Sequence, residues 1–128
     1  MSSRAFLLLA AGVSLLAPAA MMSSSAEAHA VLVKSIPSSR AVLSHPPDRV
    51  QLWFSERIEP AFSTVSVWNA AGAQVDRKDV RVGAEDPKQL SVTLPVLASG
   101  AYTVRVRVLS VDGHIVEANF PFTVKPRP

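Results

Sequence analysis

Residues 100–108, GAYTVRVRV, carry the pattern on which the fold of this chain depends. From Tyr102 to Val108 an apolar side chain occupies every second position, with threonine or arginine between. Successive side chains of a β-strand point to opposite faces, so this alternation predicts a strand with one face against a core and the other in water. A helix would instead repeat its apolar residues at intervals of three and four.

The same alternation recurs in four other runs, and turn-forming residues separate the runs. The apolar positions are Val50, Leu52 and Phe54; Val65 and Val67; Leu90, Val92 and Leu94; and Phe120, Phe122 and Val124. Turn signals include Asn69-Ala70-Ala71-Gly72, Ser99-Gly100 and Asp112-Gly113. About seven short strands result, which predicts an all-β fold, an antiparallel β-sandwich or barrel of immunoglobulin-like, cupredoxin-like type. No long helix is expected, and residues 56–62 have room for a single helical turn.

The first 28 residues have the composition of a secretory signal peptide, which predicts export to the periplasm. Arg4 supplies the positive end, residues 5–17 form a largely apolar run, and small residues follow Pro18. That run is 13 residues long. A helix that crosses a bilayer needs roughly 18 or more. We therefore expect a removable signal and not an anchor.

The cleavage site determines where the mature chain begins. Residues 26–28 (AEA) have the small-x-small pattern that signal peptidase reads, and cleavage there frees His29 as the first residue. Two other sites fit the same pattern. Residues 24–26 (SSA) would start the chain two residues earlier, and residues 28–30 (AHA) would remove His29. The first site leaves 100 of the 128 residues, 29–128, as a single domain.

Charge and sulfur content exclude several functions. The chain has 13 Lys and Arg against 10 Asp and Glu, and the basic residues are scattered among acids rather than clustered, so nucleic-acid binding is not indicated. It has no cysteine, which excludes zinc–thiolate and thiol-redox chemistry. Its three methionines, Met1, Met21 and Met22, all lie in the predicted leader. The mature chain then offers no sulfur ligand to soft Cu(I).

An N-terminal His29 would be a bidentate metal ligand. Its free α-amine and its imidazole Nδ1 can close one chelate ring on a metal ion, and the amine, with an ordinary pKa of about 7.7–8.0, loses its proton to a metal near neutral pH. Asp112 and His114, separated by Gly113, can turn to one side of a tight loop. Three nitrogens and one carboxylate oxygen suit a planar Cu(II) site better than tetrahedral zinc or all-oxygen calcium.

Other interpretations of the same residues stay open at this point. Asp-Gly is a common hairpin turn, and His114 can simply be the first residue of the next strand. His45 precedes two prolines in a turn, has no partner nearby in sequence, and is left out of the site. Arg105 and Arg107 share one strand face and are expected to be solvated.

Five segments taken together resemble the periplasmic copper-resistance protein C (CopC) family. They are His29-Ala30-Val31-Leu32, Ser35-Ile36-Pro37, Leu52-Trp53-Phe54-Ser55-Glu56, Gly100-Ala101-Tyr102-Thr103-Val104 and Ser110-Val111-Asp112-Gly113-His114. The resemblance implies a Greek-key sandwich and a Cu(II) site of His29, Asp112 and His114, with Glu56 close to the copper as a hydrogen-bond partner or contact. It also implies an inner-membrane copper-transport partner of the CopD kind. The methionine-rich Cu(I) loop of some members has no counterpart in residues 68–88, and Ile115 replaces a frequent proline.

The sequence thus predicts a monomeric Cu(II)-binding protein for copper homeostasis and resistance, and not an enzyme. Two alternatives remain. A histidine-brace copper oxidoreductase also uses an N-terminal histidine, but there a planar position stays open for oxygen, and here Asp112 would fill it. A metal-free immunoglobulin-like structural or adhesion module is favoured if cleavage removes His29.

Overall fold

The computed structural model describes residues 12, 14 and 31–128, and from residue 32 onward it is an all-β fold. Among the described residues no helix is long and apolar enough to cross a membrane. The strands are β1 (Leu32–Ile36), β2 (Ala41–Leu43), β3 (Arg49–Phe54), β4 (Ile58–Asn69), β5 (Arg81–Val82), β6 (Gln89–Thr93), β7 (Gly100–Ser110) and β8 (Ile115–Val124).

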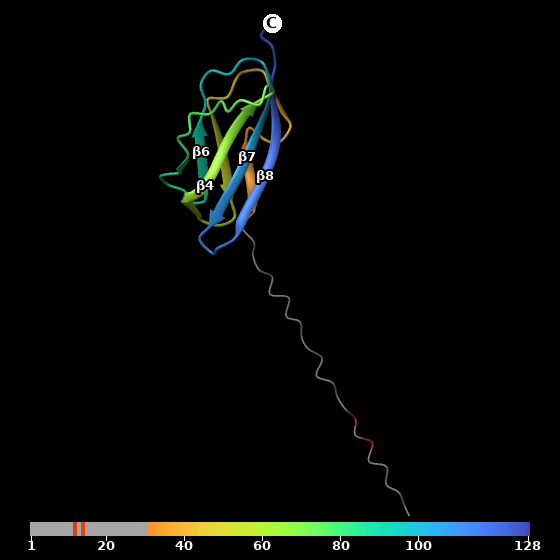
Figure 1. Ribbon diagram of the computed structural model, residues 1–128, viewed down its shortest axis with the longest axis vertical. Helices are drawn as coiled ribbons and strands as arrows, with labels where there is room; N and C mark the ends of the chain where they lie inside the picture. Colours follow the sequence, from red (N-terminus) through yellow and green to blue (C-terminus); the bar gives the residue numbers. More distant parts are fainter. Residues whose placement is uncertain (1–11, 13, 15–30) are drawn as a thin grey trace, which may run out of the picture.

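The strands form two four-stranded sheets, with the orders β1-β3-β6-β5 and β2-β8-β7-β4 (Figure 1). The predicted all-β sandwich is confirmed, with eight strands where about seven were expected. β2 and β5 have three and two residues, too few for an alternation to be visible in sequence. β2 also pairs with β8 in parallel, whereas the other five strand pairs are antiparallel as predicted.

The core lies between the sheets and consists of the residues that alternate in the sequence. Every apolar position of the five predicted runs is buried, and Val104 on β7 and Phe122 on β8 are fully so. The ring of Tyr102 stacks on Phe122 with 5.3 Å between centroids, and its hydroxyl donates to the carbonyl of Ala98 at 2.6 Å. Arg105 and Arg107 are exposed, as predicted. Burial of this apolar surface is the main stabilising contribution.

Residues 56–62 form no helical turn, because β4 begins at Ile58 and pairs there with Ser110 of β7. A β-bulge follows between Glu59 and Thr64. Pairing with β7 gives hydrogen-bond partners to backbone N–H and C=O groups that would have none in a single helical turn. This departure from the sequence prediction lies at the end of the sandwich that carries Asp112 and His114.

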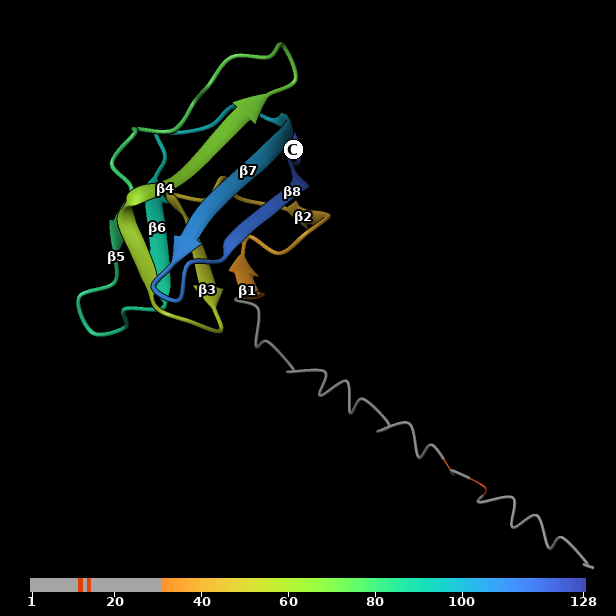
Figure 2. The same cartoon turned by 60° about the horizontal axis from the view of Figure 1, so that its bottom comes forward.

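Three segments meet at that end of the sandwich. Figure 2 shows the start of β1, the connection from β3 to β4 and the turn from β7 to β8 together, while the C-terminus lies at the opposite end. Loops gathered at one end of a β-sandwich are a frequent location for binding sites, since the sheets hold them rigidly.

Candidate metal site

The turn between β7 and β8 contains Asp112 and His114 and is organised by Ser110. Ser110 is 1% exposed, and its hydroxyl donates to a carboxylate oxygen of Asp112 and accepts the backbone N–H of His114 at 3.2 Å. Two backbone hydrogen bonds close the turn, from Ser110 N to His114 O at 2.9 Å and from Gly113 N to Ser110 O at 3.0 Å. A single buried hydroxyl thus fixes both predicted ligands.

The glycine between the two predicted ligands makes the tight turn possible. Gly113 has φ +88°, in the left-handed region that other residues enter at a cost. The turn brings Asp112 Oδ2 to 3.1 Å from His114 Nδ1, and the two side chains are 36% and 34% exposed. The structure therefore places these two side chains side by side near the surface, each about one third exposed, with the Nδ1 atom of His114 turned inward toward Asp112.

The carboxyl group of Asp112 is held in its charged form. The hydrogen bond from the Ser110 hydroxyl, followed by the interaction with His114, lowers the pKa of Asp112 below its ordinary value. Hydrogen bonds to a carboxylate favour its ionised state. At neutral pH this carboxylate oxygen can receive a cation without first releasing a proton.

The connection between β3 and β4 joins this turn to the start of the described domain. Ser55 binds Val31 twice, since Val31 N donates to Ser55 Oγ at 2.8 Å and Ser55 N donates to Val31 O at 2.9 Å. Two residues further on, the carbonyl of Arg57 accepts Val111 N at 2.9 Å. The half-buried Glu56 lies between these two anchor points. Val31, two residues after His29 in sequence, and Val111, the residue before Asp112, are thus both hydrogen-bonded to the segment 55–57 that contains Glu56.

The remaining predicted ligand, His29, lies outside the described residues, as do the signal segment and its cleavage site. Within residues 31–128 the structure contains no group of three or more His, Cys, Asp or Glu side chains arranged to hold a metal ion. His45 is exposed in the loop between β2 and β3; its neighbours Ser44 and Pro46 line a hollow with Ser99, at the opposite end of β7 from Ser110.

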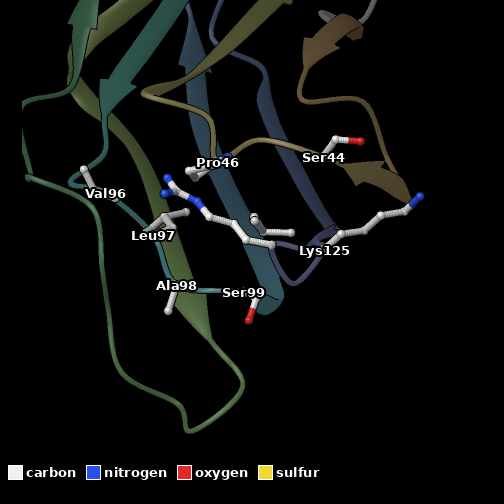
Figure 3. A pocket seen from close by; sticks show the side chains of 9 residues that line it. Ser44, Pro46, Val96, Leu97, Ala98, Ser99 and Lys125 are labelled. Atoms are coloured by element: carbon white, nitrogen blue, oxygen red, sulfur yellow. The ribbon is translucent and has the colours of Figure 1, made fainter.

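A hollow at that opposite end is shown in Figure 3 and is distinct from the candidate metal site. It is lined by Ser44, Pro46, Leu97 and Ser99, among others, with Lys125 at its edge. Ser99 directly precedes β7, and Ser110 ends it. The ten steps along β7 from Gly100 to Ser110 span about 33 Å at 3.3 Å per residue. Of the predicted ligands that the structure describes, neither Asp112 nor His114 lines this hollow.

Sequence reasoning missed the part played by Ser110. The alternation that runs through Val104, Val106 and Val108 also places Ser110 on the inward face, where a hydroxyl needs a partner. A serine at a core position, two residues before Asp112, was the available signal.

The fold and the turn define a class of protein, a β-sandwich with a carboxylate–imidazole pair at one end. Such a pair is suited to binding a metal ion. Residues 32–125 match the family model described as the CopC domain. The chain therefore belongs to the CopC family, and the predicted resemblance is confirmed.

Named relatives agree with this membership. The chain is 33% identical over 113 residues to copper resistance protein C of Xanthomonas campestris pv. juglandis, covering 84% of this chain and 88% of the relative. It is 31% identical over 98 residues to copper transport protein CutJ of Bacillus subtilis, covering 76% of this chain but 18% of CutJ. The crystal structure of CopC from Methylosinus trichosporium OB3b is similar with a TM-score of 0.73 and 39% identity, covering 78% of this chain and 97% of that one. A role in copper binding follows from the family.

Proposed function

We propose that the mature chain begins at His29 and binds one Cu(II) ion with the amine and imidazole of His29, the carboxylate of Asp112 and the imidazole of His114. It acts as a monomeric carrier and buffer in the periplasm and passes copper to an inner-membrane copper-transport protein. The observation that carries the proposal is the pair Asp112–His114, fixed 3.1 Å apart at the surface by a buried serine.

Covalent geometry supports a place for His29 in the same site. Val31 is hydrogen-bonded to Ser55, and Arg57 to the residue before Asp112. Two residues of chain span at most about 7 Å, so a His29 amine stays within reach of the end of the sandwich where Asp112 lies. Glu56, on the segment that joins these anchors, is proposed to accept a hydrogen bond from a ligand nitrogen, as groups next to metal ligands commonly do.

The donor set favours Cu(II) over other ions. Three nitrogens and one oxygen fit its planar preference, and copper leads the affinity order of divalent first-row metals. All sulfur of the chain lies in residues 1–22, so a mature chain from residue 29 has no soft ligand for Cu(I). The four positions of the plane are all filled by the protein. Oxygen would then find no open planar position, which argues against the histidine-brace oxidoreductase.

The decisive experiment is a Cu(II) titration of tag-free exported protein, with its first residue verified by intact mass, followed by electron paramagnetic resonance. We expect one Cu(II) per chain with three nitrogen donors and one oxygen donor. His114→Ala and a chain with one extra glycine before His29 are expected to lose this signature, whereas His45→Ala keeps it.

Three results would contradict the proposal. A mature mass starting at Val31 would favour the metal-free module. A spectrum unchanged by the extra glycine would remove His29 from the site. Turnover of a reductant with oxygen or peroxide by the copper-loaded protein would favour the oxidoreductase.

A further inference from the structure

We infer that Ser55 is a positioning residue for the copper site. Its hydroxyl holds Val31, two residues after His29 in sequence, at the end of the sandwich where Asp112 and His114 lie. Ser55 is not a ligand in this inference; it brings the two halves of the ligand set to one ion. The inference rests on the proposed function, because it needs His29 as the first residue and as a ligand.

The bond between Val31 and the Ser55 hydroxyl departs from the regular β-ladder. Val31 lies opposite Ser55, one step beyond the antiparallel pair Leu32–Phe54. In a regular hydrogen-bonded pair each residue donates its N–H to the carbonyl of the other. Ser55 N donates to Val31 O at 2.9 Å in this way, but Val31 N donates to Ser55 Oγ at 2.8 Å. Half of this pair therefore depends on a side chain, and only a residue with a side-chain acceptor can supply it.

The hydroxyl allows the chain to leave the ladder while still holding β1. β3 ends at Phe54, the chain bends at residues 55 and 56, and the carbonyl of Arg57 accepts Val111 N at 2.9 Å. A chain that continued the ladder with its own carbonyls could not turn toward Val111 in so few residues. The side-chain acceptor thus lets one short segment hold both Val31 and the residue before Asp112.

Few other contacts hold the start of β1. β1 is an edge strand that pairs with β3, and its register shifts between Leu32 and Lys34, which makes a β-bulge. Val31 and Val33 are 51% and 65% exposed, so their side chains contribute little anchoring, whereas Leu32 packs against the core. One apolar contact fixes a position but not a direction. The hydrogen bonds at Val31 therefore set the direction in which the chain leaves the sheet.

This direction matters because the proposed ligands form two bidentate halves, His29 on one side and the pair Asp112–His114 on the other. The affinity of two joined halves depends on their effective concentration, which falls as the connection becomes longer or looser. From Val31 to His29 the chain spans at most about 7 Å. If Val31 is released, Leu32 becomes the nearest anchor and the span grows to about 10 Å. Loss of the Ser55 hydroxyl should therefore weaken Cu(II) binding without changing any ligand.

A matched pair of serine variants tests the role of the hydroxyl in the tag-free mature chain. Ser55→Ala is expected to weaken Cu(II) binding about fivefold, the equivalent of one hydrogen bond, in competition with a chromophoric chelator. Ser55→Thr keeps the hydroxyl and should restore the affinity. Ser66→Ala is the control, because Ser66 is also half-buried and its hydroxyl accepts Trp68 Nε1 at 2.8 Å on β4. An equal loss of affinity in Ser55→Ala and Ser66→Ala would reduce Ser55 to a stabiliser of the fold and overturn the inference.

A double-mutant cycle with His29→Ala shows through which half of the site Ser55 acts. In the His29→Ala background, which lacks the chelate ring, Ser55→Ala is expected to cost less than about twofold. The same fivefold cost in both backgrounds would place the effect on Asp112 and His114 and overturn the inference. Equal Cu(II) affinities of wild type and Ser55→Ala would also overturn it, yet leave the proposed copper site intact. A wild-type spectrum without three nitrogen donors would remove the proposed site and this inference together.

Discussion

Substitution of Ser110 by alanine is expected to weaken Cu(II) binding although Ser110 is not a ligand. The change removes the hydroxyl that donates to Asp112 and accepts His114 N. The turn keeps its two backbone hydrogen bonds, and Gly113 keeps its conformation. The side chains of the two proposed ligands, Asp112 and His114, should therefore remain near their places but lose the contact that orients them.

The size of the effect follows from the contacts that are lost. Two hydrogen bonds at about 1 kcal/mol each give about 2 kcal/mol, which equals roughly a thirtyfold change in an equilibrium constant. Loss of a group that hydrogen-bonds to a metal ligand typically lowers metal affinity by about 10- to 100-fold. The two arguments agree, and we expect Cu(II) affinity to fall about thirtyfold if the loss acts on binding.

A matched control separates this effect from general destabilisation. Ser63 is also buried, and its hydroxyl also makes two hydrogen bonds, to Glu59 O and Leu109 N, away from Asp112 and His114. Ser63→Ala and Ser110→Ala should lower the free energy of unfolding by similar amounts. Only Ser110→Ala should lower Cu(II) affinity, measured by competition with a chromophoric chelator. Equal Cu(II) affinities for the two variants would refute the positioning role of Ser110.

Three further predictions follow from named contacts. The added methyl group of Gly113→Ala meets no steric obstacle, but the alanine must keep φ +88°. We therefore expect a loss of about 1 kcal/mol in the free energy of unfolding and weaker Cu(II) binding. Unchanged values in thermal unfolding and Cu(II) titration would contradict this prediction. Cu(II) should quench the fluorescence of Trp53, next to the β3–β4 connection, far more than that of Trp68. The partner of Trp68 on β7 lies seven residues, or about 23 Å of strand, from Ser110. Single-tryptophan variants measure this difference, and equal quenching of the two would contradict the site. The hydroxyl and then the backbone N–H of Thr93 lower the pKa of Asp79 from 3.8 to about 2. Because the folded state holds this proton less tightly than the unfolded state, the carboxylate stabilises the fold above pH 3.8, and that contribution is lost between pH 3.8 and about 2. Asp79→Asn should therefore make the free energy of unfolding fall less steeply as the pH is lowered through this range. The same pH dependence in wild type and variant would contradict the role given to Asp79.

The core of this fold is predictable from sequence because each long strand has one wet and one dry face. Val104 and Val106 alternate with arginines in the sequence, which predicts that both valines are buried, and the structure confirms this burial. β2 and β5 are too short to show any period. The bulge before Thr64 is invisible for a different reason, since it depends on which residues of β7 lie opposite and not on β4 alone.

The candidate site also has one part that the sequence predicts and another part that it does not. Asp112 and His114 are local to one hairpin, so their spacing and the glycine between them suffice to predict that they meet. Ser110 was missed because its contacts come from a turn whose geometry the sequence does not state. The tie between Val31 and Ser55 joins residues 24 apart and needs the pairing of β1 with β3.

The proposed site has a consequence for where copper can be bound. One of its four donors is an α-amine that does not exist while residue 28 is still joined to His29 by a peptide bond. A peptide nitrogen is not an amine ligand, so the precursor offers a single imidazole at His29 and loses the chelate ring. If His29 is a ligand as proposed, cleavage of the predicted leader would therefore complete the copper site, and only a chain that begins at His29 could hold the ion with all four donors. A precursor with a blocked cleavage site should fold into the same sandwich yet bind Cu(II) with fewer nitrogens, and an identical spectrum for precursor and mature chain would exclude the amine as a ligand.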